Sequence, residues 1–228
     1  MRRQSPHLAT IRAVLAAILI VAGGPAVVAA AVRNDPGDAR AGLGLPQPAW
    51  DLSCVPLLAN GDFEAGPGAA WSEQSAGGYA LVSDQFPHGG EYGAWLGGDD
   101  SADDTLSQSA TIPGTASRVT LVYWWAIHTL EEAHPHDVCT VELRDAQGGL
   151  IRVLETITDA ADPDVWHRRE HDLTQYKGRT VRLVFHAITD LTNPTDFFFD
   201  DVALEACDQS TARSVHLPLI LKVHLGSH

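Results

Sequence analysis

Basic side chains, cysteines and catalytic motifs are all scarce in this sequence of 228 residues. It has 15 Lys and Arg against 29 Asp and Glu, which gives a net charge of −14 at pH 7. Nucleic-acid binding needs clusters of Lys and Arg that neutralise phosphates. The deficit therefore excludes nucleic acid as an expected partner. The surplus of carboxylates suits a soluble exported protein and offers ligands for calcium.

No motif for nucleophilic or zinc catalysis stands out. There is no Gly-x-Ser-x-Gly nucleophile motif, and the cysteines have no reactive context. Histidines and acidic residues do gather in one stretch, namely His128, Glu131, Glu132, His134, His136 and Asp137. Zinc accepts imidazole and carboxylate ligands, but Pro135 interrupts any helix here and the two-histidine helical motif of zinc proteases is absent from the stretch. We predict an exposed loop there and a protein that is not an enzyme.

Long apolar runs are missing except near the N-terminus. Arg2, Arg3 and Arg12 precede an apolar run over 13–31 that ends in three alanines. This is the pattern of a secretory signal peptide, so we predict one over 1–31. An uncleaved membrane anchor is the alternative, because the run is long enough to span a bilayer. Cleavage removes three basic residues and no acidic one, leaving 12 basic and 29 acidic residues and a net charge of −17.

The chain has only three cysteines, which in an exported protein predicts one disulfide and one thiol left over. Opposite positions of antiparallel strands have residue numbers that add up to a constant. We pair Cys54 with Cys207, which closes a loop of about 150 residues and stabilises the fold by about 4–5 kcal/mol in the chain-entropy model. Cys139 alternates with Val141 and Leu143 in a strand-like run, so we expect a buried, unreactive thiol.

Helical periodicity is almost absent, and only 173–176 suggests a helical turn. The segment 32–53 is rich in Pro, Gly, Ala and Asp and is predicted to be a flexible leader. Strand-like runs follow, separated by turn signals, over 79–83, 92–96, 105–112, 118–128, 138–144, 150–158, 179–188 and 196–206. Many short strands with regular turns indicate an all-β sandwich or barrel, here over 54–207. A C-terminal tail, 208–228, contains an apolar segment at 215–221 that is too short to span a membrane.

A buried acid is expected in the last strand. Side chains alternate faces along a strand, so Phe198, Asp200, Val202 and Leu204 are predicted to share one apolar face. A carboxylate in such a place is costly unless a cation or several donors meet it. The two residue numbers add up to 261 for Cys54 with Cys207 and to 262 for Asp62 with Asp200. One antiparallel register therefore brings the two acids together, with a slip of one residue or a bulge near Gly61.

These acids predict a structural calcium ion. Calcium binds six to eight oxygens, and Asp62, Glu64, Asp200 and Asp201 with backbone carbonyls are the expected source. Asp201 lies on the opposite face from Asp200, so it contributes through its backbone or is a surface residue. A second acidic stretch, 97–104, lacks the fixed spacing of an EF-hand and is expected to be a solvated loop.

The order of five motifs carries a resemblance to a known group of modules. Asn60-Gly61-Asp62-Phe63-Glu64 is followed by Trp71, by His88-Gly89-Gly90, by Trp166 ahead of Asp172-Leu173, and by Phe198-Phe199-Asp200-Asp201-Val202. This order resembles secreted jelly-roll modules, both the MAM-like domains of immune-inhibitor-type peptidases and calcium-stabilised carbohydrate-binding modules. The resemblance implies an antiparallel jelly-roll β-sandwich with a structural calcium at Glu64 and Asp200. The tail around 215–222 is similar to tails on secreted proteins of filamentous bacteria.

Aromatic side chains are the remaining lead to a ligand. Trp124 and Trp125 are neighbours in a predicted strand, so one faces the core and the other the opposite side. An exposed indole on a sheet suits a sugar ring or a protein partner. The other candidates are Trp71, Tyr92, Trp95 and Trp166.

The leading hypothesis is a secreted, non-catalytic binding module whose partner is a carbohydrate or a cell-surface glycan. It predicts an extracellular or cell-surface location, in a bacterium. The alternative is a cell-surface adhesive or structural protein that binds other proteins through the same sandwich. The third is a metal-dependent hydrolase, or an accessory to one, built on the histidine-rich stretch 128–137. The fold alone does not choose among them, because function depends on sites carried by the fold.

Overall fold

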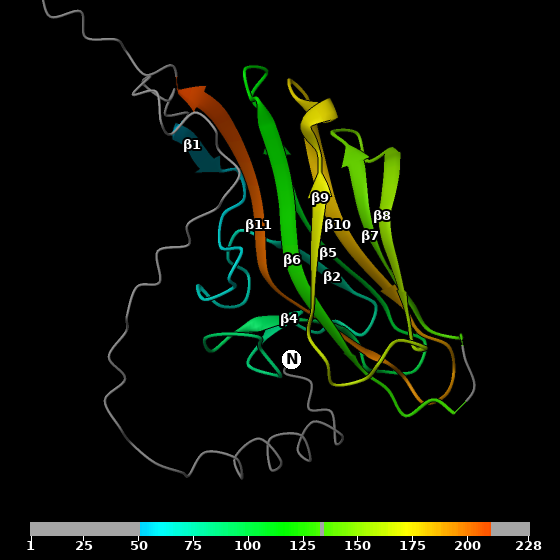
Figure 1. Ribbon diagram of the computed structural model, residues 1–228. Helices are drawn as coiled ribbons and strands as arrows, with labels where there is room; N and C mark the ends of the chain where they lie inside the picture. The colour runs from blue at the N-terminus through cyan, green and yellow to red at the C-terminus, as the bar shows by residue number, and fades with distance from the viewer. Residues whose placement is uncertain (1–50, 133–134, 211–228) are drawn as a thin grey trace, which may run out of the picture.

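The computed structural model describes residues 51–132 and 135–210, and these form two antiparallel sheets packed face to face (Figure 1). The strands are β1 (Asp51–Pro56), β2 (Ser72–Ser75), β3 (Val82–Ser83), β4 (Gly93–Gly97), β5 (Asp103–Thr111), β6 (Arg118–His128), β7 (Val138–Asp145), β8 (Leu150–Thr158), β9 (His167–Asp172), β10 (Thr180–Ile188) and β11 (Asp196–Ser210). A single 3-10 turn, η1 (Thr174–Tyr176), follows β9 among the described residues and matches the helical turn expected at 173–176.

The order of the strands is that of a jelly roll. One sheet, called sheet A, has the order β3-β4-β11-β6-β9, with β1 also paired to β11. The other, sheet B, has the order β2-β5-β10-β7-β8. The chain crosses between the sheets at nearly every step from β4 to β11, except at the β7–β8 hairpin. The predicted all-β, antiparallel jelly-roll sandwich is confirmed.

The main core lies between the two sheets. Strand β6 shows why: its inward side chains, Val119, Leu121, Tyr123, Trp125 and Ile127, are all buried in the main core. From 118 to 124 they alternate with more exposed residues. These side chains meet apolar residues of β10, so each sheet covers the apolar face of the other. Trp125, at 4% exposure, is the inward member of its tryptophan pair. The predicted alternation of Trp124 and Trp125 is therefore confirmed.

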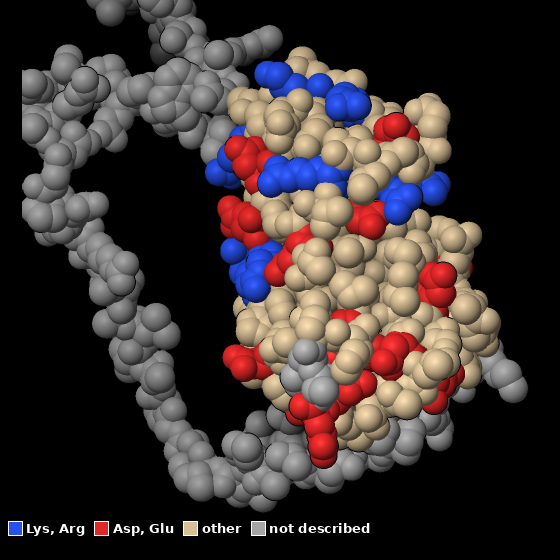
Figure 2. Space-filling model, turned by 90° about the vertical axis from the view of Figure 1, so that its right-hand side faces the viewer, with Lys and Arg blue, Asp and Glu red and all other residues tan. Residues whose placement is uncertain are grey.

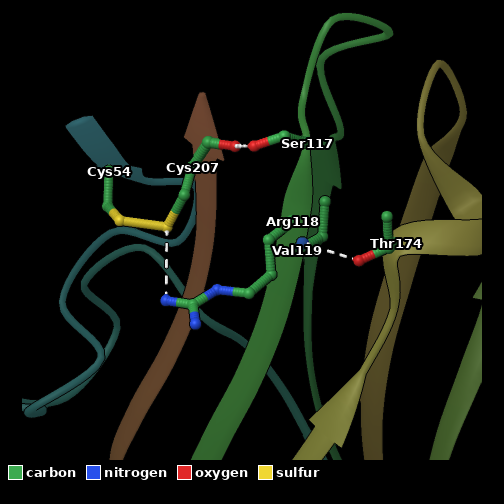
Figure 3. Close-up of a disulfide and its surroundings, with 6 residues drawn as sticks. All are labelled: Cys54, Ser117, Arg118, Val119, Thr174 and Cys207. Atoms are coloured by element: carbon green, nitrogen blue, oxygen red, sulfur yellow. Dashed lines mark hydrogen bonds between the residues drawn. A yellow bond between two sulfur atoms is a disulfide. The ribbon is translucent and has the colours of Figure 1, made fainter. Parts of the chain in front are cut away.

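The predicted disulfide joins the first and last strands. Strands β1 and β11 pair antiparallel with Cys54 opposite Cys207, and the two sulfurs are bonded across a separation of 153 residues (Figure 3). Ser117 Oγ donates a hydrogen bond of 2.8 Å to the carbonyl of Cys207, which fixes the end of β11 against the start of β6. Cys139 is the free cysteine and is buried, as predicted, and burial raises the pKa of its thiol.

A β-bulge interrupts β11 between Asp200 and Ala203. Asp201 takes a positive φ of 49° there, a backbone region that Asp tolerates better than most residues. One extra residue in a strand reverses the face to which every later side chain points. The bulge lies in β11 itself, whereas we expected either a slip of one residue or a bulge near Gly61 in the partner segment.

The predicted face of β11 is wrong for this reason. Before the bulge, Phe199 enters the main core while Phe198 and Asp200 face the outside of sheet A. After it, Val202 and Leu204 enter the main core. Asp200 therefore does not share a face with Val202 and Leu204. It lies on the outer side of the sheet, although it is only 1% exposed.

Most predicted strands are present, with shifted ends. Strand β3 is shorter than the run predicted at 79–83, and neither β2 nor β9 was among the predicted runs. Strand β1 begins at residue 51 and β11 ends at 210, so the sandwich takes in the end of the predicted leader and the start of the predicted tail. The predicted signal peptide and the rest of the leader and tail lie outside the described residues. Within 51–132 and 135–210, no helix has the length and apolar character needed to cross a membrane.

Candidate functional site: a clamped loop and an aromatic patch

The segment Asn60 to Glu64 lies in the connection between β1 of sheet A and β2 of sheet B. Asn60 Oδ1 accepts a hydrogen bond of 2.9 Å from Ala65 N, which closes the turn. Phe63 is fully buried and packs on Trp71, with 5.3 Å between ring centroids. Gly61 lies directly against β11, because a Cβ there would overlap the carbonyl of Val202. Packing and the turn thus explain most of the motif 60–64. Glu64 has a different role, which is to hold a neighbouring loop.

Glu64 holds the loop 84–92, which precedes β4. Its Oε1 accepts hydrogen bonds of 2.9 Å from the backbone N–H groups of Glu91 and Tyr92, and its Oε2 accepts one of 3.1 Å from Glu91. Gly90 has a φ of +64°, and a Cβ at this position would overlap the carboxylate of Glu64. Only glycine fits this contact without strain.

Asp200 holds the same loop from the side of the sheet. Its Oδ2 accepts hydrogen bonds from the backbone N–H groups of His88 at 2.8 Å and Gly89 at 3.1 Å, and its Oδ1 accepts one of 2.7 Å from Asp201. Burial of the carboxyl group raises the pKa of Asp200 to about 6, while these hydrogen bonds act in the opposite direction. Several donors therefore meet the buried carboxylate, one of the two kinds of compensation expected from the sequence.

The four predicted calcium ligands are only partly brought together. Glu64 and Asp200 both bind the loop 84–92. Asp200 accepts from the backbone N–H of His88, and Glu64 accepts from that of Tyr92. Asp62 is exposed and is not a ladder partner of Asp200, because the pairing of β1 with β11 ends at Pro56. Beyond it, the segment meets β11 again through the hydrogen bond of 2.8 Å from Val202 N to Gly61 O. Asp201 Oδ2 contacts His88 Nδ1 at 2.7 Å. The predicted pairing of Asp62 with Asp200 is wrong, since the strand ladder ends before it reaches them.

The loop 84–92 covers a second, smaller apolar cluster on the outside of sheet A. Trp95, Ala126 and Phe198 form its buried layer, on three adjacent strands. Phe86 of the loop and Trp166 pack over this layer, with 5.7 Å between their nearly parallel rings. Trp95 Nε1 donates a hydrogen bond of 2.7 Å to the buried Asp196 Oδ1, which satisfies its one polar atom.

Four partly exposed rings form the surface of this cluster, which we call the aromatic patch: Phe86, His88, Trp124 and Trp166. The His88 ring links the two indoles, stacking on Trp124 at 4.2 Å and meeting the edge of Trp166 at 5.2 Å. Through its Nδ1 the same ring contacts Asp201, so its orientation is fixed. The patch is a rigid, half-buried surface on which two predicted ligand-binding residues, Trp124 and Trp166, lie on either side of His88.

The other two predicted ligand-binding residues are elsewhere. Trp125 is part of the main core, where its ring lies 4.5 Å from that of His167 and beneath the guanidinium of Arg169 at 5.3 Å. Tyr92 is partly buried and packs against the main core from the end of the loop. Sequence reasoning missed Phe86 and gave His88 no role beyond the His-Gly-Gly motif, although that motif was a signal for a loop with a special backbone.

The histidine-rich stretch 128–137 does not converge on one point in its described part. His128 Nδ1 pairs with Asp164 at 2.8 Å. His136 instead lies near Glu131. His134 lies outside the described residues. Two histidines on which the metal-dependent hydrolase alternative rests, His128 and His136, therefore have different partners.

Comparison with known proteins gives similar folds and no family assignment. No family model matches the chain, and no curated protein matches it. Among solved structures, the carbohydrate-binding module TmCBM61 in complex with beta-1,4-galactotriose is 20% identical, with a TM-score of 0.46, over 66% of this chain and 97% of that one. A family 16 carbohydrate-binding module is also 20% identical, with a TM-score of 0.45, over 65% and 98%.

An adhesin domain shows the same degree of likeness. The K3 adhesin domain of Lys-gingipain from Porphyromonas gingivalis W83 is 18% identical, with a TM-score of 0.47, over 65% of this chain and 98% of that one. At these scores the likenesses do not decide what this chain binds. The resemblance to MAM-like domains stays a prediction.

Proposed function

We propose that the protein is an extracellular, non-catalytic carbohydrate-binding module and that the aromatic patch is its binding surface. The observation that supports this most directly is the pair of half-buried indoles, Trp124 and Trp166, on the outside of sheet A. The main core does not need them, because it is already filled by the inward faces of both sheets. Aromatic rings held rigidly at a surface match the apolar faces of sugar rings at little entropic cost.

Polar groups around the patch match the hydroxyl groups of a sugar. His88 has a side chain 27% exposed, and Asp201 beside it is also exposed. Arg168 lies opposite Trp124 on the neighbouring strand β9 and pairs with Glu170 at 2.9 Å. A few polar groups of fixed orientation beside an apolar surface give a ligand site its specificity. These residues are therefore the expected source of hydrogen bonds to the ligand.

We also propose that Glu64 and Asp200 hold a structural calcium ion beside the loop 84–92. Glu64 Oε2 and Asp200 Oδ1 each accept one of the hydrogen bonds described above, which leaves a lone pair on each oxygen. A hard cation prefers such oxygens, and the carbonyl groups of the loop are the nearest source of further ligands. Bound there, the ion would hold the loop that carries Phe86 and His88, and so it would maintain the patch.

The carbohydrate proposal is tested on a glycan array with the full chain, followed by calorimetry with the glycans that bind. Trp124→Ala and Trp166→Ala are expected to weaken binding at least tenfold without unfolding the protein. His186→Ala, on the outside of sheet B, is the matched control and should bind like the wild type. If no glycan binds, or if both tryptophan variants bind normally, the proposal is wrong. A protein ligand captured through the same two tryptophans would favour the adhesive alternative instead.

A further inference from the structure

A group of metal-binding side chains lies at one end of the sandwich. It comprises Glu131 and His136, from the β6–β7 connection, and Asp190, from the β10–β11 connection. One potential ligand atom of each residue lies within 4.8 Å of the others, and His136 Nδ1 is 3.8 Å from Glu131 Oε2. Ligand atoms around a tetrahedral zinc ion are about 3.3 Å apart, given zinc–ligand distances of about 2.0–2.1 Å. Small side-chain rotations are enough to close this difference.

A second, independent observation points to a missing cation. The side chain of Glu131 is only 5% exposed, and its Oε1 is buried with no hydrogen-bond partner among the described residues. Glutamate is rarely buried unless it is paired or coordinates a metal. Its neighbour in the chain, Glu132, is exposed and has no such constraint. Burial of Glu131 beside an imidazole and a second carboxylate is therefore what a metal site requires.

The backbone of the group is held by two buried acids. Asp137 Oδ1 accepts a hydrogen bond of 2.7 Å from the N–H of Asp190, and Asp159 Oδ2 accepts one of 3.1 Å from the N–H of His136. These contacts attach both connections to the same end of the sandwich before any ion binds. Binding to a site that is already arranged costs less ordering entropy.

The electrostatic environment favours a cation. In the view of Figure 2 the basic side chains lie over the upper and middle parts of the molecule, and the charged side chains over the lower end are acidic. That lower end is the one at which β6 terminates in Figure 1. The group on this acidic end includes an imidazole nitrogen, which suits zinc and related transition metals and not calcium or magnesium, since the latter prefer oxygen ligands throughout.

We propose that Glu131, His136 and Asp190 bind one zinc ion, which ties the β6–β7 connection to the β10–β11 connection. Three protein ligands leave a coordination position open, and His136, whose side chain is 46% exposed, places that position next to solvent. The site is separate from the aromatic patch and from the proposed calcium site, and no residue is shared between them. Its existence does not depend on the carbohydrate proposal.

The test is a zinc titration of the metal-depleted full chain against a chromophoric zinc indicator, with excess calcium present. The chain has 11 histidines, so the informative quantity is the difference between variants and not the total zinc bound. Glu131→Gln should lose one site or weaken it about tenfold or more, while Glu132→Gln, on the same connection but exposed, should match the wild type. Asp190→Asn should reproduce the loss.

Thermal melting distinguishes the loss of a zinc site from a loss of folding in the variants. Without metal, Glu131→Gln should melt at or above the wild-type temperature, because it removes the charge of a buried carboxylate whose Oε1 has no hydrogen-bond partner among the described residues. Zinc should raise the melting temperature of the wild type and of Glu132→Gln, but not that of Glu131→Gln. Equal zinc binding by all three proteins would overturn the proposal. So would a Glu131→Gln variant that melts lower without metal, since Glu131 would then have a structural partner.

Discussion

The outer faces of the two sheets differ in what they carry. The outer face of sheet B carries no aromatic ring, since the one Phe, Trp or Tyr in its strands is Phe185, which belongs to the main core. Its exposed apolar side chains, Leu150, Val153 and Ile188, are all aliphatic. A row across its centre reads Ser107, Val184 and Glu142, and Glu142 is neutralised by Arg144 at 2.6 Å. The outer face of sheet A instead carries the aromatic patch over a second apolar cluster.

The difference between the two outer faces indicates which side chains folding does not require. Sheet B shows that the sandwich tolerates an outer face without aromatic rings. Sheet A keeps large rings there, together with a loop that two carboxylates, Glu64 and Asp200, hold in place. Large apolar groups gathered on an outer face, with a fixed polar rim, are characteristic of binding surfaces. The contrast between faces is therefore the main physical argument for locating the ligand on sheet A.

The largest expected effect on stability is the difference between two tryptophan variants, one on each side of sheet A. Trp125→Ala truncates the main core and should lower the free energy of unfolding by about 3–5 kcal/mol. Trp124→Ala removes a half-buried ring on the outer face and should cost about 1 kcal/mol or less. Chemical denaturation of both variants measures the difference. Equal losses would mean that the outer face contributes to stability as much as the core does, and the contrast between faces would fail.

Calcium removal should act on sheet A alone. An ion that binds only the folded chain stabilises it by about 2.7 kcal/mol when its concentration is a hundred times Kd. Removing the calcium with a chelator should therefore lower the free energy of unfolding by about this amount and the melting temperature by several degrees. Calcium should restore the wild type and magnesium should not, because magnesium requires a tighter octahedral site. Glu64→Gln and Asp200→Asn should lose this response, whereas Asp103→Asn, in the rival acidic stretch, should keep it. A wild-type melt that ignores both chelator and calcium would mean that backbone N–H groups alone satisfy the two carboxylates.

Replacing one glycine in a loop of each sheet by alanine tests the contact between Glu64 and the loop 84–92. Gly90→Ala should cost about 2–3 kcal/mol, because it adds a clash with Glu64 to the strain of a positive φ. Gly148→Ala, in the β7–β8 turn of sheet B, has a φ of +89° and open space around it, so about 1 kcal/mol is expected. Urea denaturation of both variants gives the difference. A Gly90→Ala variant no less stable than Gly148→Ala would contradict the contact between Glu64 and the loop.

The smallest effect on stability is expected at two outward histidines. His186, on the outside of sheet B, pairs with the exposed Asp103 at 2.9 Å, and its replacement by Ala should change the free energy of unfolding by about 0.5 kcal/mol or less. His88→Ala should cost somewhat more, since it loses the stacking on Trp124. Only His88→Ala should alter ligand affinity. A change in ligand affinity in His186→Ala would mean that the ligand contacts sheet B, which would contradict the proposed site on sheet A.

The sequence predicted the long-range pairing of the strands better than the local placement of side chains. Cys54 and Cys207 could be paired because a disulfide and a strand register impose the same constraint. The bulge at Asp201 could not be found, because nothing distinguishes Asp201 from Asp200 in the sequence. One undetected residue reverses the faces of all that follow, and this produced the wrong face for Val202.

The candidate site was predicted in part, for a similar reason. Alternation showed that one of Trp124 and Trp125 faces outward, but not which one, since this depends on where the opposite sheet lies. Strand β9 was less evident, because its sequence is wholly polar from His167 to Asp172 and lacks an apolar alternation. The aromatic patch depends on the loop 84–92 folding back over sheet A, a tertiary contact with no local sequence pattern.

The bond between Cys54 and Cys207 has a mechanical consequence. The chain enters the sandwich through β1 and leaves it through β11, and the two strands lie side by side where the sulfurs are joined. A tension applied between residues before Cys54 and residues after Cys207 passes through this covalent bridge and bypasses the 152 residues in between. The sandwich bears no load in that geometry. Tension across the module would therefore leave the aromatic patch, which lies between the two cysteines in the sequence, undeformed.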